Sequence, residues 1–417
     1  MNLKNTIIVI MLCSFMMTLY GQDAAHCDAV HDSDTFFANN PLEKVKYDIL
    51  TKNAKLKLKA ASKGMSAKSS TSWEIPVVFH VFGETQWGKT VTYEKIKNAL
   101  EVVNDDFNGL NHDFDTVDPE FSAIKSSMNV TFKLAKLDPN GGSTNGVIFY
   151  ENEFGFGLNF DYFTDKIKTY AWDNYKYMNV YIQADYLNNG NATQSGIAWL
   201  PSSADSDNGI ARVLYNGQYL HDNTTNKEFA QLTHEFGHWM GLWHTFKGGC
   251  DDPNGDFVDD TPKEDSISGD KGCTVGASEC GYLINYENYL GYDAATGCSK
   301  MFTAGQVARM ESFLEHDARK PLWQPANLTA TGLNATGGVI AMKYGEIAES
   351  RAIDGTLPDR EYDITIEGAS FAMSSGTMAL GTHNTTDLPT GISVTIKVID
   401  NKTLKAKFTG QFTNHAY

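Results

Sequence analysis

The chain has 417 residues, of which 41% are hydrophobic and 20% are charged. This composition is ordinary for a folded globular protein and excludes a chain dominated by disorder. The formal net charge is −17, from 51 acidic and 34 basic residues. We therefore expect no nucleic-acid or anionic-membrane partner, because both are polyanions, whereas cations and cationic substrates stay open.

The first 21 residues are typical of a secretory signal peptide. Lys4 precedes an apolar run at residues 6–20, and Gly21 offers a small residue for cleavage. The run is shorter than the ~20 apolar residues that a membrane-spanning helix needs, so we expect no membrane span. These features predict a secreted, extracellular protein.

Residues 22–70 differ in character from the rest of the chain. Residues 41–59 can form a basic amphipathic helix, and the Ser-, Ala- and Lys-rich stretch 60–72 is typical of an exposed, cleavable linker. We interpret residues 22–70 as a propeptide. An N-terminal extension without function is the alternative.

A compact α+β region begins near residue 73. The apolar run 74–82 predicts a buried strand, and the helical spacing of apolar residues in 92–110 predicts a helix. His80 lies in that strand, where a core histidine is a better explanation than a metal ligand. Further strands are predicted at residues 129–137, 178–184, 196–200 and 210–215.

Residues 326–417 predict a small all-β, sandwich-like accessory domain, because short β-prone runs alternate with Gly, Asn, Asp and Pro. The runs lie at 327–332, 337–344, 361–368, 377–380, 391–399 and 402–411. No catalytic constellation is visible there. We interpret this region as a structural module, with substrate positioning, carbohydrate binding and export as alternatives.

The most informative motif is H-E-x-x-H-x-x-G-x-x-H at residues 234–244. On a helix, His234 and His238 project from the same face, where their imidazole nitrogens can bind one Zn²⁺. Glu235 lies between them and suits the general-base role toward the attacking water. A bare H-E-x-x-H also occurs by chance on structural helices, but the extended motif weakens that explanation.

The residues around this motif support a helix and a third ligand. Thr225 and Glu228 form a candidate capping box at the start of the helix. Gly241 lets the chain leave the helix with a positive φ, so that His244 can become the third protein ligand. The fourth position is left for water, as a catalytic zinc requires.

Four cysteines cluster within residues 250–298 and predict two disulfides in an oxidising compartment. The spacing does not choose among the three possible pairings. A cysteine zinc site is the alternative, although no C-x-x-C pair occurs. Cys27 is left over as an odd thiol.

Several motifs in order resemble the metzincin metalloproteases, and within them the pappalysin-like group. The resemblance covers residues 71–325 and implies a catalytic domain with a twisted mixed sheet, helices and a loop-rich lower subdomain. The last helix of that domain would begin at Thr303, which forms a capping-box candidate with Gln306. The motifs are IPVVFHV at 75–81, GIAWLP at 196–201, HEFGHWMGLWHTFKGGC at 234–250, GDFVDDTP at 255–262 and CSKMFTAGQVARM at 298–310.

The resemblance also implies a turn beneath the zinc that carries a Met, in a pattern close to N-Y-M-x-Y. At the matching residues 285–289, Glu287 takes the Met position. A carboxylate near three zinc-bound imidazoles would change polarity and packing, which keeps impaired hydrolysis open. Tyr289 matches a tyrosine that bonds the tetrahedral oxyanion, with a packing role as the alternative.

Further implications concern disulfides, calcium and latency. The resemblance pairs Cys250 with Cys280 and Cys273 with Cys298. A thiolate from Cys27 would block the open zinc position in the zymogen, and an incidental thiol is the alternative. Structural Ca²⁺ is expected in the acidic loop, which could instead be merely solvated, and its ligand candidates are Asp256, Asp259, Asp260 and Thr261.

Together these features predict a secreted zinc endopeptidase, made as a zymogen, that acts on protein or peptide substrates. An extended substrate would pair with the strand around residues 196–200. The alternative is a zinc-binding adhesin or binding protein with impaired hydrolysis, argued from Glu287. No feature predicts the oligomeric state.

Overall fold

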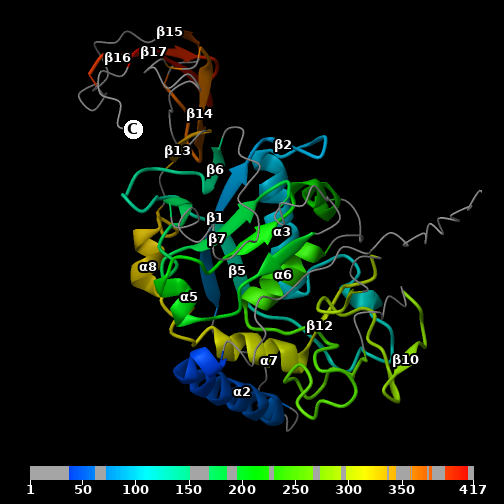
Figure 1. Ribbon diagram of the computed structural model, residues 1–417. Helices are drawn as coiled ribbons and strands as arrows, with labels where there is room; N and C mark the ends of the chain where they lie inside the picture. The colour runs from blue at the N-terminus through cyan, green and yellow to red at the C-terminus, as the bar shows by residue number, and fades with distance from the viewer. Residues whose placement is uncertain are drawn as a thin grey trace, which may run out of the picture.

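The computed structural model describes residues 37–61, 72–150, 169–185, 195–224, 230–265, 273–292, 297–335, 338–343, 357, 359–372, 375–377 and 390–411. A sheet lies at the centre with helices packed around it, and a second sheet stands at the C-terminal end (Figure 1). No helix within these ranges is long and apolar enough to cross a membrane. The predicted signal peptide, Cys27, most of the linker and the Thr225–Glu228 capping box lie outside the described residues.

The central sheet has the strand order β5–β1–β7–β9–β8, and β6 pairs with the second half of β1. All its strands run parallel except β8, which is antiparallel to β9 and forms an edge. The strands are β1 (Trp73–Phe82), β5 (Val130–Leu134), β6 (Val147–Tyr150), β7 (Met178–Ile182), β8 (Gly196–Ala198) and β9 (Val213–Tyr215). The predicted α+β class with a mixed sheet is confirmed, although β6 was not predicted.

His80 is a core histidine, as expected for the middle of β1. Its Nδ1 lies 3.0 Å from the Tyr150 hydroxyl and its Nε2 lies 3.1 Å from Asn179 Oδ1. Burial lowers its pKa to about 4, so the ring is neutral near neutral pH. The side chain is therefore satisfied within the core.

Helices α3 (Tyr93–Asn108) and α6 (Gln231–Trp239) share one apolar core with this sheet. Helix α3 begins after Thr92, whose side chain accepts a hydrogen bond from the Lys95 N–H, and ends at Gly109 with φ 66°. Its buried apolar residues recur at helical spacing: Ile96, Ala99, Leu100, Val103 and Phe107. Helix α3 therefore supports α6, which carries the H-E-x-x-H motif.

The described residues between α6 and α7 (Ala304–Phe313) hold little regular structure, and two disulfides pin this lower part. They join Cys250 to Cys280 and Cys273 to Cys298, the pairing that the resemblance implies. The Thr303 side chain accepts from the Gln306 N–H, and the Gln306 side chain accepts from the Thr303 N–H. The predicted capping box of α7 is thus confirmed.

The remaining short elements connect these parts. Strand β12 (Phe302–Thr303) pairs with β4 (Lys125–Ser126) and so ties the start of α7 to the segment before β5. The others are β2 (Thr85–Gln86), β3 (Lys89–Thr90), η1 (Phe114–Thr116), α5 (Ser203–Asp207), η2 (Gly217–Thr224), β10 (Ser278–Glu279) and β11 (Tyr282–Leu283).

Helix α2 (Pro41–Ala61) lies along α7 at the opposite side of the molecule from the C-terminal sheet (Figure 1). The helix predicted at residues 41–59 is confirmed. Residues 62–71 of the linker lie outside the described residues, and the described chain resumes at residue 72, immediately before β1.

The C-terminal region begins with a helix where a strand was predicted. Residues 327–332 fall on α8 (Pro325–Ala330) and the turn after it, because Pro325 occupies the first helical turn and fixes a helical φ. One antiparallel sheet comes next, in the order β13–β14–β17–β16–β15. Its strands are β13 (Val339–Met342), β14 (Glu361–Glu367), β15 (Gly376–Thr377), β16 (Ile392–Val398) and β17 (Thr403–Gly410). A second sheet, as a sandwich requires, is not among the described residues.

Candidate metal centre

Three buried histidines meet at the end of helix α6. The Nε2 atom of His238 lies 3.0 Å from that of His234 and 3.1 Å from that of His244, and the third separation is 3.2 Å. Among the His, Cys, Asp and Glu side chains of the described residues, these three lie close enough together to hold a metal ion. The structure thus brings together all three predicted zinc ligands.

The turn at Gly241 places the third histidine. Gly241 has the predicted positive φ, 99°, and a Cβ there would lie 2.7 Å from Cγ of Phe313. Arg309 Nε donates to the Gly241 carbonyl at 2.7 Å. Backbone conformation, tight packing and a charged donor therefore all fix the turn that leads to His244.

Two backbone carbonyls set the tautomers of the helical histidines. Nδ1 of His234 lies 2.6 Å from the Tyr289 carbonyl, and Nδ1 of His238 lies 2.8 Å from the Leu242 carbonyl. A carbonyl can only accept, so each Nδ1 carries the proton and each Nε2 presents a lone pair to the cluster. Hydrogen bonds of this kind orient metal-binding imidazoles.

The electrostatics of the cluster favour a cation. Burial lowers the pKa of His234 to about 4, and burial together with the neighbouring imidazoles lowers the pKa values of His238 and His244 well below 6.5. The rings are therefore neutral near neutral pH, and the Nε2 lone pairs of His234 and His238 face each other across 3.0 Å. Neutral imidazole is a zinc ligand at about 2.0–2.1 Å, and nitrogens this close together can all reach one ion. The donor set fits zinc.

Glu235 lies between the helical histidines and against the edge strand β8. Its side chain is fully buried, and a Cβ added to Gly196 would lie 2.7 Å from Glu235 Oε1. A larger residue at position 196 would displace the carboxylate. The predicted general base is therefore held beside the strand expected to receive substrate.

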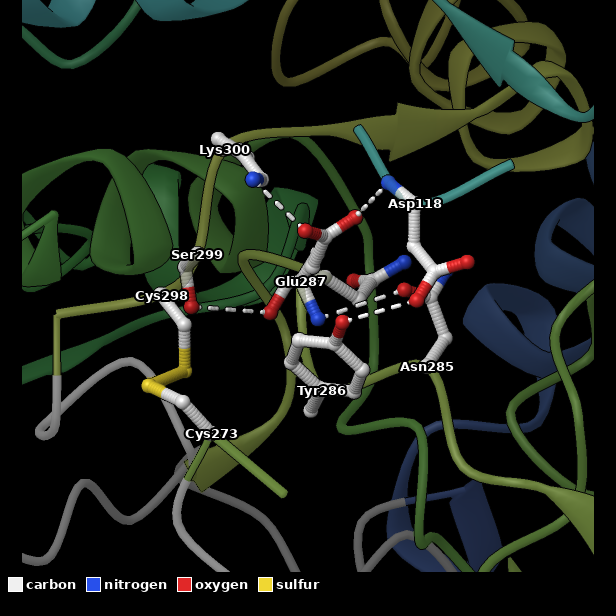
Figure 2. The surroundings of a disulfide bond; sticks show 9 residues. Asp118, Cys273, Asn285, Tyr286, Glu287, Cys298, Ser299 and Lys300 are labelled. Atoms are coloured by element: carbon white, nitrogen blue, oxygen red, sulfur yellow. Dashed lines mark hydrogen bonds and ion pairs between the residues drawn. A yellow bond between two sulfur atoms is a disulfide. The ribbon is translucent and has the colours of Figure 1, made fainter. Parts of the chain in front are cut away.

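The structure places Glu287 and Tyr289 differently from the expectation. Glu287 Oε1 pairs with Lys300 Nζ at 2.6 Å, and Oε2 accepts from the Asp118 N–H at 2.7 Å. Figure 2 shows this carboxylate between its two partners, beside the Cys273–Cys298 disulfide. The charge of Glu287 is thus compensated by its own neighbours, and the side chain packed against Gly237 of α6 is that of Leu290 instead.

The Tyr289 phenol also points elsewhere. Its hydroxyl bonds Asp106 on α3, its ring packs 4.7 Å from that of Phe302, and the side chain is almost completely buried. Asp106 Oδ2 also accepts from Thr233 Oγ1 at 2.6 Å, and burial raises its pKa to about 7. Tyr289 serves the site through its backbone carbonyl on His234 rather than through its phenol.

Two residues that the sequence reasoning missed lie where residues 287 and 289 were expected: one is packed under α6, and one is beside the histidines. Leu290 is fully buried under α6, where a Cβ on Gly237 would meet its Cδ2 at 3.0 Å. The Tyr292 ring lies 5.0 Å from that of His244 and 6.5 Å from that of His234. The signal was a second N-Y-x-x-Y pattern at residues 288–292, which overlaps the first one.

The proposed calcium ligands bond mainly to protein donors. Asp256 accepts from Thr261 Oγ1 at 2.8 Å, and Asp260 accepts from Thr303 Oγ1 at 2.7 Å and from the Gly305 N–H at 2.8 Å. Asp259 instead pairs with Lys55 of α2 at 2.6 Å. Asp256, Asp259, Asp260 and Thr261 line one cavity, and calcium binding there stays a prediction, tested by whether added Ca²⁺ raises the melting temperature.

Comparisons with known proteins agree with this geometry. Residues 161–315 match the family model described as pregnancy-associated plasma protein-A. Extracellular metalloproteases of Sordaria macrospora and Neurospora crassa are each 39% identical, over 147 and 149 residues, and each match covers 33% of this chain and 48% of the relative. The chain thus spans about half the length of these curated relatives.

Solved structures share the fold. Mature mirolysin of Tannerella forsythia, in complex with a cleaved peptide, is 25% identical with a TM-score of 0.52, over 63% of this chain and 99% of that chain. A promirolysin mutant of the same organism is 24% identical with a TM-score of 0.54, over 71% and 96%.

Fold and histidine cluster together define a metalloprotease domain of the metzincin class. Within that class, residues 161–315 match the pappalysin-like family model, and the extracellular metalloprotease relatives are similar to this part of the chain.

Proposed function

We propose that this chain is a secreted, zinc-dependent endopeptidase made as a zymogen. The observation that carries the proposal is the convergence of the Nε2 atoms of His234, His238 and His244 within 3.2 Å. The Nε2 lone pairs of His234 and His238 oppose each other at 3.0 Å, which is destabilising unless a cation lies between them. The family's extracellular relatives and the predicted signal peptide support secretion.

A zinc ion bound there would polarise the scissile carbonyl and lower the pKa of the attacking water. Glu235 accepts a proton from that water at a carboxylate oxygen and later gives it to the leaving amine. Tyr292 lies beside the histidines and donates a hydrogen bond to the carbonyl oxygen as negative charge develops there.

Strand β8 supplies a binding edge for an extended peptide. Among the strands that the structure describes, β8 pairs with β9 and ends the strand order of the central sheet. A peptide that adds to this edge would pass beside Gly196, and so beside the Glu235 carboxylate. Main-chain hydrogen bonds would then bind the peptide backbone independently of the peptide's side chains.

Latency by Cys27 is part of the proposal. Its thiolate would bind the metal and exclude water until the N-terminal segment is displaced. In support, Cys27 takes no part in the two disulfides, and the Ser-, Ala- and Lys-rich composition of residues 60–72 suits a cleavable linker.

The alternative is a zinc-binding adhesin or binding protein with impaired hydrolysis, argued from Glu287 at the Met position. The apolar Leu290, rather than Glu287, lies against Gly237 of α6, which supports the protease over this alternative. Stoichiometric zinc without peptide cleavage would nevertheless favour it.

The test uses residues 22–417 with Cys27→Ala, beside the same chain with Glu235→Gln. We expect cleavage of quenched-fluorescent peptides by the first protein, loss of this activity with a zinc chelator and recovery with Zn²⁺. Glu235→Gln keeps the size of the side chain but cannot accept the proton, so we expect a loss of at least ~10²-fold with zinc still bound. Equal activity of the two proteins would contradict the proposal.

A further inference from the structure

Helix α2 is buried against the protein as a core element would be. Tyr47, Leu50 and Ala54 on one face of the helix are each at most 8% exposed. The Tyr47 ring packs edge-on to that of Phe313 at 4.8 Å. Helix α2 and α7 lie side by side along their length (Figure 1).

The cluster that α2 completes reaches the metal centre. Tyr47 and Leu50 share one buried group with Leu200, Trp243 and Phe313. Leu200 lies just after the edge strand β8, and Trp243 directly precedes the ligand His244. Loss of α2 would expose this apolar group to water next to both features.

Arg309 joins α2 to the turn of the metal centre. It is buried on α7, where its Nε donates to the Gly241 carbonyl and its Nη1 donates to Thr51 Oγ1 at 2.9 Å. One guanidinium therefore holds both the turn before His244 and the middle of α2. Nearby, Ser312 Oγ donates to the Leu50 carbonyl at 2.7 Å.

The charges of α2 complement the surface that it covers. Three lysines of α2 pair with acidic residues outside the helix: Lys46 with Asp317, Lys55 with Asp259 and Lys57 with Glu311. Inside the interface, Glu43 Oε2 lies 3.0 Å from His316 Nε2. A basic helix on an acidic protein thus has apolar, polar and ionic contacts at once.

From these contacts we infer that α2 is a retained part of the metal centre: it stays docked on α7 after the chain is cut within residues 62–71, and it stabilises the turn that carries His244. A cut there would leave Cys27, which precedes α2, tethered to the protein, so displacement of Cys27 from the metal would need a further cut before α2. This inference deepens the proposed function, and it rests on that proposal because it takes the bound metal to be zinc.

The outer face of α2 provides matched controls. Leu42, Val45 and Ile49 are at least 54% exposed, although they belong to the same helix. Replacement of Ile49 by Ala therefore changes the helix without changing the interface. Thr51→Val removes the hydroxyl that Arg309 holds while it keeps the side-chain shape.

The experiment uses residues 22–417 with Cys27→Ala and a site-specific protease sequence in place of residues 64–70. After cleavage, size-exclusion chromatography and mass spectrometry track the α2 fragment, and competition with a chromophoric chelator gives the zinc affinity. We expect the α2 fragment to co-elute with the remainder of the protein in the wild type and in Ile49→Ala. In Tyr47→Ala, the fragment should be released.

Zinc affinity is the second readout. We expect about tenfold weaker zinc binding in Tyr47→Ala and in the uncut Thr51→Val protein.

Separation of the wild-type fragment under native conditions would overturn the inference. Unchanged zinc affinity in both Thr51→Val and Tyr47→Ala would overturn it as well. If the uncut parent protein binds no zinc, the proposed function fails, whereas co-elution still measures the docking of α2. The two ideas can therefore fail separately.

Discussion

Single residues at the metal centre differ in role although they share a sequence pattern. Tyr289 and Tyr292 each end an N-Y-x-x-Y stretch, but the first bonds Asp106 in the core and the second lies beside the His244 ring. A phenol can stabilise an oxyanion only where the substrate carbonyl reaches it. The geometry therefore favours Tyr292 for this role.

A pair of isosteric variants tests this assignment. Tyr292→Phe removes the hydroxyl beside the histidines, and we expect kcat to fall about 10²-fold with KM little changed. Tyr289→Phe removes only the bond to Asp106, and we expect lower stability with kcat near that of the parent. The reverse ranking of kcat would restore the assignment made from the sequence.

At the scale of elements, α7 is anchored at its first turn by two acceptors. Thr303 caps the Gln306 N–H, and Asp260 accepts from the Gly305 N–H. The positive end of the helix dipole favours the Asp260 carboxylate at this place. The cap therefore fixes the helix that supports both α2 and the turn at Gly241.

Loss of the cap should be measurable as stability. Thr303→Ala leaves the Gln306 N–H without its acceptor, and we expect about 1 kcal/mol less unfolding free energy in urea. Thr303→Ser keeps the hydroxyl and serves as the control. An equal loss in both variants would attribute the effect to the buried methyl group instead.

For the whole molecule, α2 links stability to pH. Burial raises the pKa of Glu43, but the bonds to His316 and Lys46 outweigh it and lower the value from 4.5 to about 2. A carboxyl with a lowered pKa stabilises the folded state above its unfolded pKa, and this contribution is lost as the pH falls through the folded pKa. The docking of α2 should weaken between about pH 4.5 and pH 2.

Urea unfolding at several pH values tests this linkage. We expect wild-type protein to be more stable than Glu43→Gln at pH 7, with a difference that shrinks as the pH falls from 4.5 toward 2. Asp48→Asn alters an exposed pair with Lys44 on the same helix and should change little at any pH. A difference between wild type and Glu43→Gln that is constant with pH would contradict the assigned cause.

Much of the local structure could be predicted from the sequence, because it depends on near neighbours. The four-residue spacing of His234 and His238, the glycine before His244 and the Thr303–Gln306 cap all derive from helix periodicity and backbone sterics. The strand at residues 327–332 was wrong because a proline at the first helical turn outweighed β propensity.

What the sequence by itself predicted is the chemistry of the site: which histidines could form a ligand set, which glutamate lies between them, and where α7 is capped. Tertiary structure alone decided which of two overlapping N-Y-x-x-Y stretches lies under α6, because both have the same local pattern and only packing against α6 distinguishes them. It also decided what α2 packs against. An amphipathic pattern specifies an apolar face, whereas the partner of that face depends on which distant residues the fold brings within contact.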